Sequence, residues 1–107
     1  MRNLFLEIDF GVGQLHTTDN ILDLDRSLED QKEHLFQDIL QVIYPNDYTL
    51  DIGWYPRCHE ITANSFFAVY AIKDANWNEP ILIKKCNDLV TLKSMIITSV
   101  NFIAKQI

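Results

Sequence analysis

The first half of the chain shows two hydrophobic patterns with different periods. Residues 3–10 carry an apolar side chain at every second position, which predicts a strand with one buried face. A polar, acidic connection over residues 11–26 follows, and it has room for a short strand or a turn. Residues 27–43 place apolar side chains at helical spacing, with Ser27 as the candidate N-cap and Pro45 as the residue that stops the helix.

The second half predicts three strands and a closing helix. Residues 48–55 alternate, with Trp54 on the core side and Tyr55 on the outer side. The segment 61–73 contains a run, residues 66–72, that is apolar at almost every position, so we expect it in the interior of a sheet. The last two predicted elements are a strand at residues 81–85 and an amphipathic helix at residues 87–106.

These elements predict a fold of the α+β class. Strands that are close in sequence favour an antiparallel meander, and two amphipathic helices would cover it, giving two layers in the order β-α-β-β-β-α. The 107 residues, with 48% hydrophobic and 22% charged positions and no linker, indicate a single domain over residues 1–107. No stretch suits a secretory signal or a membrane span, so we expect a cytoplasmic protein.

Charge is distributed unevenly along the chain. The formal net charge is −6; residues 1–60 hold 12 acidic and 4 basic side chains, whereas residues 61–107 hold 3 and 5. This balance argues against nucleic acid and favours a basic protein partner. The expected contact residues are Asp19, Asp23, Asp25, Glu29, Asp30 and Glu33, with Tyr55 or Trp77 as an aromatic anchor. Trp77 is equally well explained as a side chain that folds back onto the core.

Candidate chemistry is sparse. Cys58, His59 and Glu60 are adjacent, but neighbours in an extended segment point apart, and the spacing matches no zinc motif. Cys58 and Cys86 are expected to be reduced in a cytoplasmic protein. Gly11 and Gly13 lack the third glycine of a dinucleotide-binding turn. We therefore expect no catalytic residue, no metal and no cofactor.

The segment from Ser65 to Ile81, SFFAVYAIKDANWNEPI, has a strand that ends in Lys-Asp, a Trp in the turn, and Glu-Pro before the next strand. With the amphipathic helix that follows, residues 48–107 resemble small bacterial immunity proteins of contact-dependent growth inhibition and other polymorphic toxin systems. The resemblance implies a cytoplasmic protein that binds and neutralises a cognate toxin domain, often a nuclease with a basic cleft, by stoichiometric inhibition. It assigns no contact residue.

Two other classes of function remain open at this stage. One is a generic interaction or assembly subunit, including a homodimer formed through a sheet edge, although a monomer or weak dimer is our expectation. The other is a small enzyme that uses two carboxylates, for which the sequence supplies no companion Lys or His at a fixed spacing.

Overall fold

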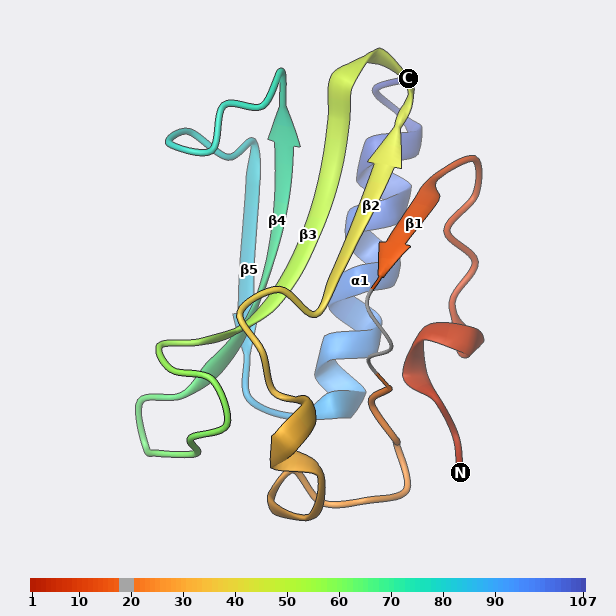
Figure 1. Cartoon of the computed structure of the whole chain (residues 1–107). Helices are drawn as coiled ribbons and strands as arrows, with labels where there is room; N and C mark the ends of the chain where they lie inside the picture. The colour runs from red at the N-terminus through yellow and green to blue at the C-terminus, as the bar shows by residue number, and fades with distance from the viewer. Residues whose placement is uncertain (18–20) are drawn as a thin grey trace.

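An antiparallel sheet runs through the centre of the molecule (Figure 1). The computed structural model describes residues 1–17 and 21–107. Within them the strands are β1 (Gln14–Thr17), β2 (Leu40–Tyr44), β3 (Tyr48–Tyr55), β4 (Phe66–Lys73) and β5 (Leu82–Cys86). They lie in chain order, and each pairs antiparallel with the next. The predicted antiparallel meander is confirmed. In the described residues it has five strands, two more than the three strands of the second half from which it was predicted.

The long helix α1 (Leu89–Ala104) covers one face of this sheet (Figure 1). It begins at Asp88, whose carboxylate accepts a hydrogen bond from the backbone N–H of Thr91 at 2.8 Å. Its apolar side is buried and packs against β4, β5 and β3. There the rings of Trp54 and Phe67 meet edge to face, with centroids 4.7 Å apart. The core therefore lies between α1 and the sheet.

Most predictions for the second half of the chain are confirmed. The strands expected at 48–55, 66–72 and 81–85 are β3, β4 and β5, and the expected helix at 87–106 is α1. β4 lies between β3 and β5, in the interior of the sheet as its two apolar faces predicted. Trp54 faces the core and is buried, again as predicted.

The predicted strand over residues 3–10 is wrong. This stretch contains a short 3₁₀ helix, η1 (Leu4–Glu7), which starts at Asn3. The side-chain oxygen of Asn3 accepts a hydrogen bond from the backbone N–H of Phe5 at 3.2 Å and so stabilises the first turn. Leu6, which the alternation groups with the buried side chains, is 83% exposed. The strand in this region is β1, which lies in the connection over residues 11–26, where the sequence allowed either a short strand or a turn.

The predicted helix over residues 27–43 is also wrong. Its first part is a short 3₁₀ segment, η2 (Glu29–His34), and its last part belongs to β2. The side chain of Gln31 is fully buried and explains the first part. Its amide donates to the carbonyls of Asp23 at 2.9 Å and Arg26 at 3.1 Å, and its oxygen accepts from the N–H of Asp23 at 2.7 Å. These bonds order the preceding loop around one side chain.

One α-helix, not two, therefore covers the sheet in the described part of the chain. The α+β class, the two layers and the mostly antiparallel sheet stand. The face of the sheet opposite α1 has no helix of the described chain packed on it (Figure 1).

Gly53 in β3 makes a close contact with the chain just before β2. The backbone N–H of Trp54 donates to the carbonyl of Phe36 at 2.7 Å, which holds this segment against β3. A Cβ atom at Gly53 would lie 1.9 Å from the carbonyl oxygen of Gln37, so only glycine leaves room for that backbone. Gln37 and its neighbour Asp38 consequently lie over the face of the sheet that points away from α1.

We predict that Gly53→Ala lowers the free energy of unfolding by at least about 2 kcal/mol, because backbone, rather than a mobile side-chain end, must move to admit the methyl group. Urea unfolding followed by tryptophan fluorescence measures this change. Thr49→Ala, on the same face of β3, is the matched control and should change stability by less than about 1 kcal/mol. Equal effects of the two substitutions would contradict the close contact.

Candidate functional site

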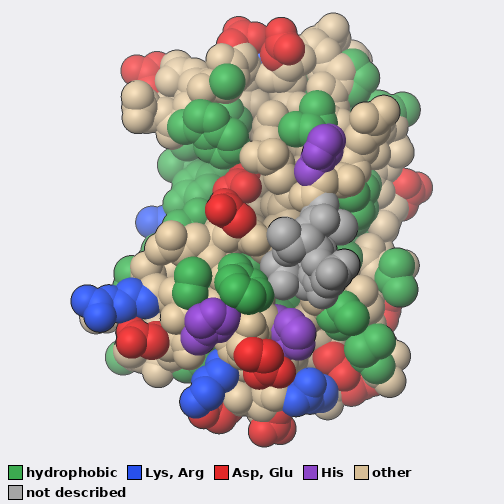
Figure 2. Space-filling model, viewed as in Figure 1, with side chains coloured by type: hydrophobic (Ala, Val, Ile, Leu, Met, Phe, Trp, Pro, Cys, Tyr) green, Lys and Arg blue, Asp and Glu red, His purple; other side chains and the backbone are tan. Residues whose placement is uncertain are grey.

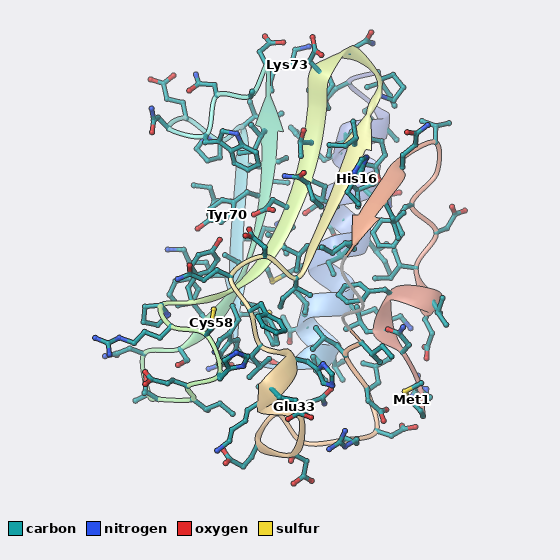
Figure 3. The ribbon with its side chains drawn as sticks, in the orientation of Figure 1. Met1, His16, Glu33, Cys58, Tyr70 and Lys73 are labelled. Carbon is teal, nitrogen blue, oxygen red and sulfur yellow. The ribbon has the colours of Figure 1, made fainter. Side chains whose placement is uncertain are left out.

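Alternate residues of the strands form a second face of the sheet, opposite α1. We call it the outer face. It comprises Gln14, His16, Gln41, Ile43, Thr49, Asp51, Gly53, Tyr55, Phe66, Ala68, Tyr70, Ile72, Ile83 and Lys85. Figure 3 shows two of them, His16 on β1 and Tyr70 on β4, on either side of β2 and β3.

One row of paired residues crosses the whole outer face. In strand order it consists of His16, Gln41, Asp51, Tyr70 and Ile83, each directly opposite the next. Directly opposed residues in antiparallel strands hold their side chains in contact range. The row is polar on β1, β2 and β3, and it becomes aromatic and aliphatic on β4 and β5. It therefore offers a partner two adjoining surfaces of different character.

Aromatic rings form the apolar side of the outer face. The rings of Tyr55 and Phe66 stack with centroids 5.9 Å apart, and Tyr70 meets Tyr55 edge to face at 6.2 Å. The ammonium group of Lys85 lies 4.8 Å from the centre of the Phe66 ring. Figure 2 shows hydrophobic side chains gathered over β4 and β5 on this side of the molecule. Ile83 completes this surface and is exposed.

A small hollow adjoins the rings. Its volume is about 260 Å³, and it is lined by His16, Asp38, Ile39, Leu40, Gln41 and Asp51. Asp51 is only 6% exposed, and its carboxylate oxygens, to which no described residue donates a hydrogen bond, open to the hollow, because no fully buried side-chain oxygen of the described residues lacks a partner. Burial, and to a lesser degree the charge of Asp38, raises the pKa of Asp51 from 3.8 to about 6. The hollow thus contains a carboxylate whose charge the protein itself does little to stabilise.

Tyr55 contributes a neutral phenol to this region. Burial first, and the nearby carboxylate of Asp51 second, raise the pKa of Tyr55 to about 12. Its hydroxyl donates weakly to the backbone carbonyl of Gln37 at 3.4 Å. Tyr55 points to the outer face, as the alternation of the strand predicted. The ring therefore serves as a packing surface and not as an acid or a nucleophile near neutral pH.

The predicted acidic contact residues do not form one continuous surface. Asp19 lies outside the described residues. Asp23 is 7% exposed, and its carboxylate accepts hydrogen bonds from the backbone N–H groups of Arg2 at 3.1 Å and Asp25 at 2.9 Å, which lower its pKa. It stabilises the fold at the N-terminus and leaves little surface for a partner.

The remaining predicted acids are exposed at one end of the molecule. They are Asp25, Glu29, Asp30 and Glu33. Asp25 lies 3.5 Å from the guanidinium of Arg2, and Glu29 lies 3.0 Å from the ammonium of Lys32. Figure 2 shows acidic and basic side chains intermixed there. These surface pairs reduce the negative field that the sequence predicted for this segment.

The two predicted aromatic anchors lie at opposite ends of the sheet. Tyr55 ends β3 near η2, whereas Trp77 lies in the turn that follows β4, beyond Lys73 (Figures 1 and 3). Trp77 is 48% exposed, so it does not fold back as a full lid on the core. One partner surface cannot use both rings without spanning the length of the sheet.

Cys58 and His59 lie in a turn that follows β3, and Glu60 comes directly after it. The backbone carbonyl of Glu60 accepts a hydrogen bond from the indole of Trp54 at 2.8 Å. The ring of His59 packs edge-on against Phe36 at 4.8 Å. Cys58 and Cys86 are free thiols. Among the described residues no group of three His, Cys, Asp or Glu side chains is placed to hold a metal ion.

Sequence reasoning missed His16, Asp38 and Asp51 as one site. The alternation of β3 did place Asp51 and Tyr55 on the same face, which is the one available signal. Asp38 was hidden because its segment was taken for a helix. The approach of Asp38 to Asp51 depends on the contact at Gly53, which no local pattern reveals.

The chain matches no family of known proteins, no curated protein and no solved structure. No helix in residues 1–17 and 21–107 has the length and apolar character that a membrane span requires.

We predict that Asp51→Asn removes a pH dependence of stability. The folded pKa of Asp51 is raised, so the native state binds more protons between about pH 4 and pH 6, and the free energy of unfolding falls as the pH rises through that window. At about pH 7.5 the variant should be more stable than the natural chain by roughly 1–3 kcal/mol. At about pH 3.5 the two proteins should have the same free energy of unfolding. Urea unfolding across this range measures the difference.

Asp74→Asn, at an exposed aspartate with positive φ that asparagine tolerates, is the matched control and should leave the pH profile unchanged. If the difference in unfolding free energy between the natural chain and Asp51→Asn stays constant from about pH 4 to about pH 7, the burial of this carboxylate is contradicted.

Proposed function

We propose that the protein is a cytoplasmic immunity protein that binds a cognate bacterial toxin domain and neutralises it by stoichiometric protein–protein inhibition. The observation that carries this proposal is the outer face, a sheet surface with aromatic rings beside two carboxylates and no helix of the described chain packed over it. A face of this composition is typical of a protein interface, where tyrosines supply packing area and buried charges supply specificity.

Charge supports a basic partner, and a nuclease domain is the best candidate. The chain carries a net charge of −6, which accelerates encounter with a cationic surface. Nucleases that bind phosphate backbones need clustered Lys and Arg. The carboxylates of Asp38 and Asp51 lie next to the packing surface rather than far from it, so they suit direct contact with such a cluster.

The size of the hollow favours protein binding over a small-molecule substrate. Pockets that enclose a cofactor or a metabolite usually have about 300–1,000 Å³, and this hollow falls below that range. A side chain from a partner needs less space. The hollow therefore complements the surrounding flat face instead of replacing it as the binding site.

Self-association is disfavoured at two places in the described chain. The edge strand β5 carries Lys84 and Lys85, which resist pairing with another edge. A two-fold contact centred on the row of paired residues would bring two Asp51 carboxylates together. These features favour a different partner over a second copy.

We predict that Ile83→Arg and Tyr70→Arg each weaken toxin binding by at least about tenfold, because they place a cation and a larger side chain in the middle of the contact surface. Calorimetry with the toxin domain encoded by the neighbouring gene, and survival of cells that express both proteins, measure the effect. Ile97→Arg, on the exposed side of α1, is the matched control and should bind like the natural chain.

Two outcomes would contradict this account. If the toxin kills cells equally with and without the natural chain, the proposed function fails. If Ile97→Arg disrupts binding while both outer-face variants bind normally, the function stands and the surface is misplaced. Thermal unfolding of each variant separates loss of binding from loss of fold.

A further inference from the structure

The hollow beside the aromatic rings has the chemistry of a receptor for one cationic side chain. We propose that it receives an arginine of the bound toxin domain, with the guanidinium between Asp38 and Asp51 and next to the ring of Tyr70. This inference rests on the proposed function and deepens it, because it states which group of the partner enters which part of the outer face.

Asp51 is the observation that points to a ligand. Asp51 is 6% exposed and lines the hollow, and no side-chain hydrogen bond to it is found among the described residues; no fully buried side-chain oxygen there lacks a partner, so its carboxylate oxygens open to the hollow. Burying a carboxylate without a partner is unfavourable, and folded proteins rarely keep such a group without a use for it. A cation with N–H donors that enters the hollow would supply the missing hydrogen bonds and charge.

The fold builds the hollow from two directions. Asp51 comes from the regular part of β3, where strand pairing on both sides fixes its position. Asp38 comes from the segment that lies over Gly53, and its charge acts on Asp51. Because the absence of a side chain at Gly53 admits that segment, the convergence of the two acidic groups is a consequence of backbone packing and not of a flexible loop.

The surroundings favour arginine over lysine. A guanidinium is planar, donates several N–H groups in a fixed fork to carboxylates, and stacks on aromatic rings. Tyr70 is directly opposite Asp51, and Tyr55 holds Tyr70 edge to face from the same surface. A lysine ammonium could neutralise the carboxylates, but it would use neither the fork geometry nor the ring. Gln41 adds a side-chain amide on the other flank of Asp51.

The direct test uses the full chain and a small probe. N-acetyl-L-arginine N-methylamide is titrated into the ¹⁵N-labelled protein, and backbone amide shifts are followed by NMR. The expected result is saturable shifts at the amides of Gln41, Asp51, Gly53 and Tyr70. Asp51→Asn should weaken this binding by about tenfold or more, since a hydrogen bond to a charged group is lost. Asp74→Asn should bind like the natural chain.

The same titration with the capped citrulline derivative is the control for shape, because citrulline replaces the guanidinium by a neutral urea of nearly equal size. It should produce no saturable shift in the hollow. The capped lysine derivative should bind several-fold more weakly than arginine, as its point charge lacks the fork.

The results that would overturn the proposal are distinct from those that would overturn the proposed function. Absence of saturable shifts in the hollow, or equal arginine binding by Asp51→Asn, refutes the arginine receptor. So does binding confined to the exposed acids near Glu29. If the natural chain nevertheless protects cells from the toxin, the proposed function stands and only the role of the hollow is lost.

Discussion

The structure depends on the close approach of the backbone at Gln37 to Gly53. This contact joins the two halves of the chain, because the segment before β2 can lie against β3 only where β3 has no side chain. The hydrogen bond from Trp54 to the carbonyl of Phe36 secures it from the neighbouring position. A helix through this segment, which its apolar spacing favours, would forfeit both contacts.

The same contact explains why the outer face has a polar side. With Gln37 over Gly53, Asp38 lies beside Asp51 at the edge of the hollow, where burial first and the charge of Asp38 second raise the pKa of Asp51. The aromatic side of the face, around Tyr70, has no such cost. An uncovered face that combines packing surface with a largely buried carboxylate opening to a hollow suits a complementary partner, and this is the physical basis of the proposed inhibitor.

The sequence predicted those elements whose contacts are local. α1 shows the expected helical period, β3 was found from its alternation, and β4 from its continuous apolar run. Residues 27–43 were misassigned because apolar spacing there fits a helix equally well, while the deciding contacts of Gln31 and Gly53 reach distant parts of the chain. For the site, alternation placed Asp51 and Tyr55 on one face. It could not predict that Asp51 is buried, since that depends on neighbouring strands.

We propose that the outer face, and not α1 or the acidic end, contacts the partner. Hydroxyl-radical footprinting of the complex with the toxin domain distinguishes these surfaces, since mass spectrometry then reports the side-chain reactivity of each aromatic residue and each methionine. The account predicts that Tyr70 and Phe66 lose reactivity on binding, while Trp77 and Met95 keep theirs. Protection of Trp77 or Met95 with unchanged reactivity at Tyr70 would contradict it.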